Sequence, residues 1–366
     1  MQRKRILILT SEFPPQPGGI GTHAYQLAYH LQEASHTVTV IADERSDSGV
    51  EEAAFDNTLS FKVQRIVKRR LRVLMYVKRL CLLFKYLPSN EIVIASGKFP
   101  LWVVAFASLF YKRQYMAVLH GSEVNFTQSL LNRSIRVSLQ RFTTLVAVSH
   151  FTKSLVQDHH DAVVVIPNGI PVRQFEAQAS LPKDLKGYPK LITVGNVTER
   201  KGQLNVIRQL PELIKAYPEL HYHCVGLPTQ RDAFEAEASL LGVLEHVSFH
   251  GRVSDMELRS FLNESDIFVM LSSPTSTGDV EGFGIAILEA NAMGLPAIGA
   301  LGCGIEDAIE DFKSGRLIAY DDLAAFKTSI EELMTQNAHY KEHARSWALK
   351  HDWALIVNRY IAVFEK

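Results

Sequence analysis

Short apolar runs alternate with longer amphipathic stretches along most of the chain. An apolar run at residues 6–9 predicts a buried strand, and a loop rich in proline and glycine follows at 11–19. Residues 20–33 then carry apolar side chains at helical spacing, and residues 38–41 form a second apolar run. A strand, a helix and a second strand in this order place the two strands parallel in one sheet. The pattern therefore predicts an α/β fold.

The same alternation continues to the C-terminus. Further strands are predicted at residues 61–67, 91–95, 115–119, 143–148, 163–166, 191–195, 222–226, 247–250, 267–271, 295–298 and 315–319. Helices are predicted at residues 101–111, 233–241 and 256–262, and helices end the chain. Residues 43–56 are polar and acidic and predict a surface loop. A chain of 366 residues is long enough for two domains, and a linker is expected at residues 170–188.

The most informative stretch joins the strand predicted at residues 267–271 to a helix that ends at Gly294. Gly282 and Gly284 stand at the start of this helix. Glycines at such a join leave backbone N–H groups free at the positive end of the helix, which suits a phosphate.

Two carboxylates, Glu281 and Glu289, bracket this anion site. An acid beside a phosphate is unfavourable unless it contacts something else, and sugar hydroxyls are suitable partners because a carboxylate can accept two of them. The alternative is that Glu281 only supplies the negative charge that stabilises a helix start. The pair of acids with glycines between them favours the sugar interpretation.

The net charge is zero but unevenly distributed. Residues 1–180 carry 21 Lys/Arg and 13 Asp/Glu and the remainder carries 18 and 26, so the two halves have charges of +8 and −8. Residues 65–85 contain eight Lys/Arg and no Asp/Glu among apolar side chains, which predicts a basic amphipathic helix. Its basic face either meets solvent or contacts anionic lipid headgroups, through Arg65, Lys68, Arg69, Arg70, Arg72, Lys78 and Arg79. No nucleic-acid recognition module follows, so nucleic acid is not an expected partner.

Several kinds of site are not expected. The three cysteines have no paired spacing, which favours a reducing compartment. The sequence has no Asp-x-Asp string and no helical His pair, so we expect neither a metal site nor a bound cofactor. The run at residues 6–9 is too short for a signal peptide, and no uncharged apolar segment reaches the roughly 18 residues of a membrane span. We expect a cytoplasmic protein, peripheral on the inner face of the cytoplasmic membrane if the basic stretch binds lipid.

The acids Glu281 and Glu289, with seven residues between them, resemble the paired-glutamate motif of family 4 retaining glycosyltransferases. The string at residues 279–285, Asp-Val-Glu-Gly-Phe-Gly-Ile, is similar to that of the family's mannosyltransferases, including those that act on phosphatidylinositol mannosides. The resemblance extends over nearly the whole chain. It implies the GT-B fold, in which two Rossmann-like doubly wound parallel-sheet domains face each other across a cleft.

The resemblance also implies how the chain is divided. Residues 1–170 would form an N-terminal acceptor-binding domain, and residues 171–350 a C-terminal nucleotide-sugar-binding domain. Residues 351–366 would form a C-terminal helix that crosses back to the first domain.

By the resemblance, Glu281 lies beside the donor sugar and Glu289 binds the ribose of the nucleotide. The other donor-binding residues that it implies are Gly18, Gly19, Lys201, Arg252, Gly282, Phe283, Gly284 and Ile285. In the family, an arginine and a lysine hold the diphosphate; Lys201 matches the lysine, but the arginine position is Asn196 here. Asn196 can donate a hydrogen bond but carries no charge. Arg200 either supplies the missing cation or is a surface charge.

His120 and Glu123 directly follow the strand predicted at residues 115–119. The carboxyl edge of an open parallel sheet is where ligands bind, and His120 matches a His-Gly segment of the family. We expect His120 to contact the donor sugar and Glu123 to orient the acceptor. The catalytic candidates are thus His120, Lys201 and Glu281.

The predicted activity is retaining transfer of a hexose from a nucleoside diphosphate sugar, GDP-mannose or a UDP-sugar, to a glycan or lipid-linked acceptor. The acceptor would belong to the synthesis of cell-surface polysaccharide, lipopolysaccharide or glycolipid. The reaction would need no metal, because Lys201, helix ends and glycine N–H groups would meet the diphosphate charge. Two alternatives stay open: a GT-B epimerase that changes the sugar nucleotide itself, and a non-catalytic partner subunit.

Overall fold

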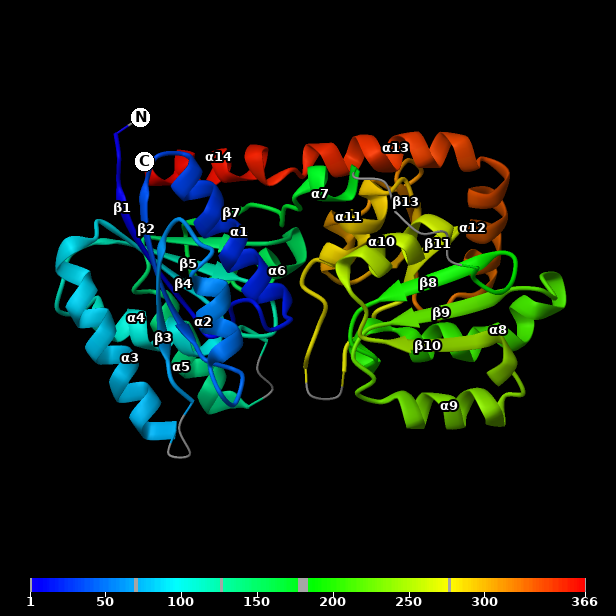
Figure 1. Cartoon of the computed structure of the whole chain (residues 1–366), viewed down its shortest axis with the longest axis horizontal. Coiled ribbons are helices and arrows are strands. Elements are labelled where there is room, and N and C mark those ends of the chain that lie inside the picture. Colours follow the sequence, from blue (N-terminus) through cyan, green and yellow to red (C-terminus); the bar gives the residue numbers. More distant parts are fainter. Residues whose placement is uncertain (1, 69–71, 126–127, 177–183, 276–277, 366) are drawn as a thin grey trace. The chain divides into compact units, whose positions relative to one another are not determined.

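The computed structural model describes residues 2–365 apart from 69–71, 126–127, 177–183 and 276–277. The chain divides into two compact units (Figure 1). The first unit consists of Met1–Asn168 and Trp353–Lys366, and the second of Gly169–Asp352. The divisions fall at 168/169 and 352/353, where the sequence predicts 170/171 and 350/351.

The first unit is built on a seven-stranded parallel sheet with the order β3-β2-β1-β4-β5-β6-β7. Its strands are β1 (Arg5–Thr10), β2 (Thr37–Asp43), β3 (Lys62–Ile66), β4 (Ile92–Ser96), β5 (Gln114–Leu119), β6 (Thr144–Ala147) and β7 (Val163–Val165). The order runs outward in both directions from β1 and β4. A topological switch point therefore lies between these two strands.

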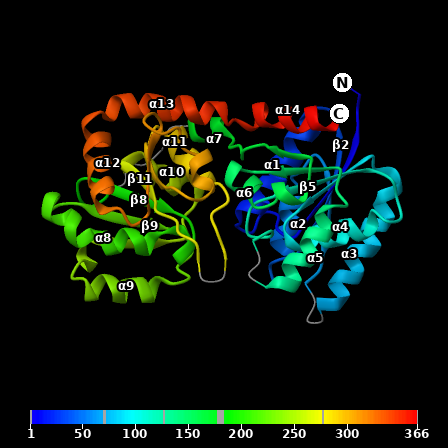
Figure 2. The same cartoon turned by 180° about the vertical axis from the view of Figure 1, so that it is seen from behind.

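Helices cover both faces of this sheet, as the opposite views of Figures 1 and 2 show. The helices are α1 (Gly19–Glu33), α2 (Val50–Asp56), α3 (Arg72–Tyr86), α4 (Lys98–Ala107), α5 (Ser129–Leu139), α6 (His150–Ser154) and α14 (Trp353–Phe364), with 3-10 turns η1 (Leu87–Ser89) and η2 (Gln157–His159). α3, α4 and α5 share one hydrophobic core with the sheet, and α14 packs against α1. Residues 6–9 of β1 are fully buried, as expected for a parallel strand covered on both faces.

The second unit has a six-stranded parallel sheet in the order β10-β9-β8-β11-β12-β13. Its strands are β8 (Lys190–Val194), β9 (His221–Val225), β10 (Val247–Gly251), β11 (Ile267–Met270), β12 (Ala297–Ala300) and β13 (Gly315–Ile318). Its helices are α7 (Val172–Glu176), α8 (Gln203–Ala216), α9 (Arg231–Leu240), α10 (Asp255–Glu264), α11 (Ile285–Ala292), α12 (Leu323–Thr335) and α13 (Asn337–Lys350), with 3-10 turns η3 (Glu199–Lys201), η4 (Leu244–His246) and η5 (Gly304–Asp307). The prediction of two doubly wound parallel-sheet domains is confirmed.

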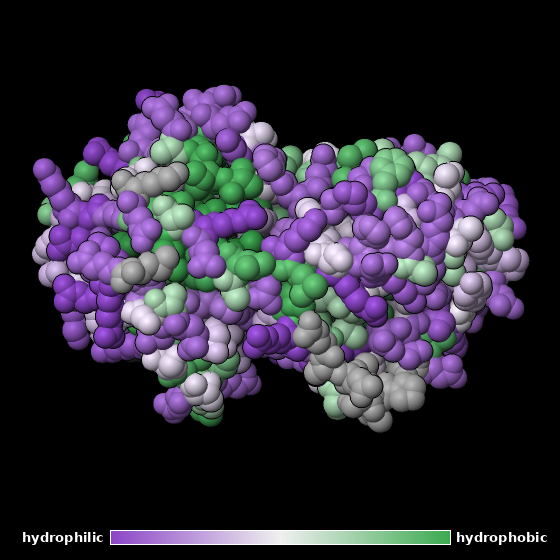
Figure 3. Space-filling view, turned by 90° about the horizontal axis from the view of Figure 1, so that it is seen from above, coloured by the Kyte–Doolittle hydropathy of each residue, from purple (hydrophilic) through white to green (hydrophobic). Residues whose placement is uncertain are grey.

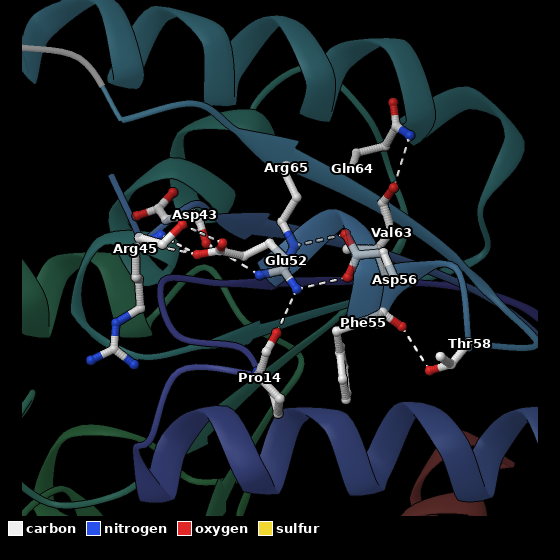
Figure 4. A network of polar contacts seen from close by, with 11 residues as sticks. Pro14, Asp43, Arg45, Glu52, Phe55, Asp56, Thr58, Val63, Gln64 and Arg65 are labelled. Carbon is white, nitrogen blue, oxygen red and sulfur yellow. Dashed lines mark hydrogen bonds and ion pairs between the residues drawn. The ribbon is translucent and has the colours of Figure 1, made fainter. Parts of the chain in front are cut away.

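The acidic segment at residues 43–56 contains α2, so the prediction of a surface loop there is wrong in part. α2 begins after Gly49, whose φ of 70° lies in the left-handed region. Glu52 is buried, and its carboxylate accepts hydrogen bonds from the backbone N–H groups of Arg45 and Ser46 (Figure 4). Burial alone would raise the pKa of Glu52, but its hydrogen bonds lower the pKa to about 2. Two of the acids that suggested a solvated loop, Glu51 and Glu52, instead lie in the first turn of a helix, where negative charge is stabilising.

Two arginines of the basic stretch are held inside the first unit. Arg79 is buried and forms an ion pair with Asp43. Arg65 Nη2 lies 2.7 Å from Oδ1 of Asp56 and donates a hydrogen bond to the carbonyl oxygen of Pro14 (Figure 4). The prediction that Arg65 and Arg79 face a membrane is therefore wrong. Each arginine forms an ion pair with a carboxylate of the same unit, and breaking the pair would leave that carboxylate without a counter-charge.

The rest of the basic stretch is only partly described. Lys68 is exposed and lies 2.7 Å from a carboxylate oxygen of Asp47. Lys78 is exposed on α3. Arg69 and Arg70 lie outside the described residues, and so does the side chain of Arg72.

Candidate functional site

Two loops leave the second sheet at its switch point. The loop after β8 leads into η3, and the loop after β11 leads into α11. Because β8 and β11 are adjacent and parallel, both loops emerge at the carboxyl edge, where the strand order reverses. Open α/β sheets bind their ligands at this position.

A cluster of opposite charges joins these two loops. Lys201 Nζ lies 2.8 Å from Oε2 of Glu281, and Arg200 forms an ion pair with the same carboxylate. Arg200 Nε also lies 3.2 Å from Oδ2 of Asp279. Glu281 is only 8% exposed, so its charge is balanced by two cations rather than by water. The structure thus brings Glu281, Lys201 and Arg200 together, and Arg200 is more than an isolated surface charge.

The charge state of Glu281 follows from these contacts. Burial alone would raise its pKa, but the charges of Lys201 and Arg200 outweigh burial and hold the pKa below its ordinary value. The Gly284 backbone N–H adds to this lowering. Glu281 is therefore ionised at neutral pH. A second anion entering the site would compete with Glu281 for Lys201 and Arg200.

Glycines allow the two loops to approach closely. Gly202 has a φ of 79°, and a Cβ there would lie 2.1 Å from the carbonyl oxygen of Leu271. Gly195 has a φ of 148°, and a Cβ there would lie 3.1 Å from Cε of Lys201. A larger residue at either position would push η3 or the Lys201 side chain away from Glu281.

The N-terminus of α11 begins directly after the acid of this cluster. Gly284 caps the helix with a left-handed φ of 91°. The Phe283 side chain is buried and lies 6.2 Å from the ring of His351, between centroids. The side chain of Phe283 is therefore a packing group, and the contact of this residue with a donor stays a prediction. The N–H groups at the start of a helix can face an anion.

Glu289 is partly buried within α11. Burial and, to a smaller extent, the charge of Asp255 raise its pKa to about 7, against the opposing charge of Lys201. Near neutral pH, both the acid and the carboxylate are populated, so Glu289 can donate or accept a hydrogen bond from a hydroxyl. Asp255, at the start of α10, is a neighbour that the sequence did not predict.

Two further predicted residues lie in the turns that follow β8 and β10. Asn196 is exposed after β8, and Arg252 is exposed after β10. Both strands run parallel to β9, so the two residues stand at the same carboxyl edge as the charged cluster.

In the first unit, polar side chains gather at the carboxyl ends of β4 and β5. His120 Nε2 lies 3.0 Å from the Ser96 hydroxyl. Burial lowers the pKa of His120 to about 4, so its imidazole is neutral at pH 7. Glu123 is fully buried, and its Oε1 accepts a 2.5 Å hydrogen bond from the backbone N–H of His120. Burial raises the pKa of Glu123 to about 7.

Glu123 therefore fixes the backbone at His120, and its contact with an acceptor stays a prediction.

Gly18 and Gly19 lie where the loop after β1 enters α1. A Cβ on Gly18 would lie 2.2 Å from Oε2 of Glu12, so this carboxylate would have to move.

The predicted residues thus form two groups, one in each unit. His120, Glu123, Gly18 and Gly19 belong to the first, and the donor-binding residues from Asn196 to Glu289 belong to the second. Sequence reasoning missed three residues of these groups. Asp279 forms an ion pair with Arg200, and Ser96 and His23 both contact His120. Asp279 could have been found, because it stands in the same short string as Glu281.

Two family models match successive parts of the chain. The model described as Glycosyltransferase Family 4 matches residues 17–174, and the model described as Glycosyl transferases group 1 matches residues 175–348. The chain belongs to glycosyltransferase family 4. The resemblance inferred from Glu281 and Glu289 is confirmed.

Similar proteins carry names that point to different substrates. The GDP-mannose-dependent alpha-(1-6)-phosphatidylinositol monomannoside mannosyltransferase of Mycolicibacterium smegmatis is 27% identical, over 94% of this chain and 94% of that protein. A glycogen synthase of Mycobacterium tuberculosis is 24% identical, over 93% of this chain and 89% of that protein.

Solved structures show the fold of this family 4 glycosyltransferase to be GT-B. A glycosyltransferase from Rickettsia africae has a TM-score of 0.78 at 18% identity, over 100% of this chain and 98% of that one. HepE of Anabaena, in complex with UDP and glucose, has a TM-score of 0.78 at 17% identity, over 99% and 100%.

Every described helix is too short or too polar to cross a bilayer. In the same part of the chain, His, Cys, Asp and Glu side chains form no group of three or more that could hold a metal ion.

Proposed function

We propose that this glycosyltransferase moves mannose from GDP-mannose to the glycan part of a lipid-linked acceptor, with retention of the anomeric configuration. The observation that carries the proposal is the cluster in which Lys201 and Arg200 surround Glu281 at the start of α11. It offers two cations and a helix N-terminus to a diphosphate, and a carboxylate to sugar hydroxyls. The names of relatives such as the mannosyltransferase of M. smegmatis favour mannose.

The leaving group of this reaction is a nucleoside diphosphate. Stabilising its developing charge lowers the barrier, because that charge is larger in the transition state than in the bound donor. Lys201 binds the diphosphate, and Arg200 provides the second cation that Asn196 lacks. The N–H groups at the start of α11 complete the site, so transfer proceeds without a metal ion.

Glu281 and Glu289 orient the donor in this proposal. Glu281 turns from its two cations toward hydroxyls of the sugar once the diphosphate takes its place, and Glu289 binds the ribose. The acceptor oxygen attacks the anomeric carbon on the face from which the diphosphate leaves. The bond to the diphosphate breaks, and the acceptor proton passes to the departing phosphate oxygen. His120 contacts the reacting sugar and is held in place by Glu123 and Ser96.

The donor is identified by a hydrolysis and binding screen over GDP-mannose, GDP-glucose, UDP-glucose, UDP-galactose and ADP-glucose. We expect GDP-mannose to be bound most tightly by calorimetry and to be hydrolysed slowly without acceptor. An extract of membrane lipids that supplies the acceptor should increase its turnover. Proton NMR of the first product should show the α-anomer. A preference for a UDP-sugar would refute the donor, and a β-product would refute retention.

The two alternative functions give different results in the same screen. An epimerase releases a changed sugar or sugar nucleotide at full rate without acceptor. A non-catalytic subunit binds none of the five nucleotides tightly. Either result would contradict glycosyl transfer by this chain.

We further propose that the first unit binds an anionic membrane surface that presents the acceptor. Hydrophobic residues gather on one face of this unit (Figure 3). Phe106, Leu109 and Phe110 at the end of α4 are 47%, 55% and 61% exposed. Lys85 and Lys112 are exposed at the adjacent ends of α3 and α4. Apolar side chains flanked by lysines suit a lipid interface. Arg65 and Arg79 suit it less, because they form ion pairs with Asp56 and Asp43.

Flotation with vesicles of phosphatidylglycerol and phosphatidylcholine tests this surface. Leu109→Asp is expected to weaken vesicle binding by about tenfold or more, since it places a charge where the exposed leucine would contact lipid. Leu240→Asp is the matched control, because Leu240 is 83% exposed in the second unit. Binding should fall as salt is added. Equal effects of the two substitutions, or binding that ignores salt, would rule this surface out.

A further inference from the structure

His120 is held by a second histidine as well as by Ser96. The ring of His23, one turn into α1, meets the ring of His120 edge to face, with centroids 5.0 Å apart and planes at 81°. This arrangement is favourable for aromatic rings and restricts how the His120 imidazole can rotate. The Ser96 hydroxyl also binds Nε2 of His120, and the two contacts together restrict the direction of the ring.

His23 is in turn held by the C-terminal helix. Its Nε2 lies 2.9 Å from the hydroxyl of Tyr360, and its ring lies 5.1 Å from the ring of Trp353, between centroids. Trp353 and Tyr360 stand about two turns apart on one face of α14, and both are fully buried. A chain of contacts therefore runs from α14 through His23 to His120, all within the first unit.

The polar atoms of His23 are unusual for a packing residue. Its Nδ1 is buried and finds no hydrogen-bond partner among the described residues. A buried unsatisfied ring nitrogen is unfavourable, and an apolar side chain could fill the same space without that cost. Burial, followed by the nearby His120, lowers the pKa of His23, so both imidazoles are neutral at pH 7. The contacts of His23 with Tyr360 and His120 therefore have to offset this cost.

We propose that His23 is a positioning residue through which Tyr360 of α14 sets the orientation of the His120 imidazole during glycosyl transfer. This rests on the proposed function, in which His120 contacts the reacting sugar. Catalytic groups must be held within a narrow range of geometry by their neighbours. The hydroxyl of Tyr360 fixes the rotation of the His23 ring, and the edge of that ring fixes the His120 ring.

Tyr360→Phe tests the contact because it removes one hydroxyl and keeps the ring. We expect kcat to fall about tenfold, the range seen when contacting residues are coupled, while KM for the donor changes less than twofold. Tyr340→Phe is the matched control. Tyr340 is an equally buried tyrosine whose hydroxyl bonds Glu332 in the second unit, and its loss should leave kcat unchanged.

A double-variant cycle separates positioning from general stability. In an enzyme that already carries His120→Ala, Tyr360→Phe should have no further effect on the residual kcat, because the ring to be positioned is absent. An equal fall in both backgrounds would show that Tyr360 acts only on folding and would overturn the proposal. An unchanged kcat in Tyr360→Phe alone would overturn it as well.

Replacing both His23 and Tyr360 by phenylalanine covers the case of a single variant that folds poorly. The double variant leaves no unpaired polar atom and keeps the aromatic contacts, so its melting temperature should be close to that of the wild type while kcat stays low. Recovery of kcat together with stability would show that His23 only packs. A separate result tests the role of His120 in the proposed function. If His120→Ala turns over the donor at the wild-type rate, the assignment of His120 is wrong.

Discussion

Replacing Lys201 with alanine is expected to lower kcat/KM for the sugar nucleotide by about 10²–10³, the loss seen when one preorganised donor to a developing charge is removed. Lys201 Nζ lies 2.8 Å from Glu281 beside the start of α11, and its side chain is 15% exposed against 26% for Arg200. The diphosphate gains negative charge as the glycosidic bond breaks, so kcat should fall more than KM rises.

Lys215→Ala is the control for Lys201→Ala. Lys215 is an exposed lysine at the end of α8 that pairs with Glu212, so its loss removes an equal charge from the same unit. Initial rates with saturating acceptor and calorimetric titration with GDP are measured for both variants. If Lys201→Ala keeps wild-type turnover while its circular dichroism is unchanged, the diphosphate site has been placed wrongly.

The sheets could be predicted from the sequence because parallel strands covered on both faces read as uninterrupted apolar runs. β1 and β11 are examples, since all the residues of β11 and residues 6–9 of β1 are buried. The helix α2 was missed because its sequence is acidic. Its stability depends on Glu52 accepting hydrogen bonds from residues 45 and 46, which no periodicity reveals.

The basic stretch shows where charge patterning is misleading. A run of cations predicts a charged surface only if no anion lies near it in space. Asp43 and Arg79 are 36 residues apart in the chain but form a buried ion pair, because β2 and α3 pack together. Arg65 likewise pairs with Asp56. The exposed apolar end of α4 had no signal in this pattern, because residues 101–111 are apolar almost throughout and their sequence predicts a buried helix.

The candidate site could be predicted only in part, because some of its contacts join residues that are far apart in the sequence. Glu281 and Lys201 could be proposed from glycine-rich joins that follow buried strands, since such joins recur at ligand sites. Whether Arg200 joins them could not be decided until its ion pairs with Asp279 and Glu281 were known. The contact of His23 with Tyr360 spans 337 residues, and no local rule connects the two.

Glu281→Gln is expected to separate sugar orientation from phosphate binding. The substitution keeps the size of the side chain but removes the charge that Lys201 and Arg200 now balance. The carboxylate and the diphosphate compete for these cations, so GDP should bind as tightly as in the wild type or more tightly. The sugar loses a charged hydrogen-bond acceptor, so kcat should fall by about 10²–10³.

This opposite response of affinity and rate distinguishes Glu281 from Lys201, whose loss weakens both. Glu332→Gln is the control, since Glu332 pairs with Arg316 in the second unit and lies in α12, away from the β8 and β11 loops. GDP affinity is measured by calorimetry and kcat by product release under saturating donor. Weaker GDP binding with unchanged kcat would mean that Glu281 only supports the fold of the 279–285 loop. The carboxylate would then have no part in holding the sugar.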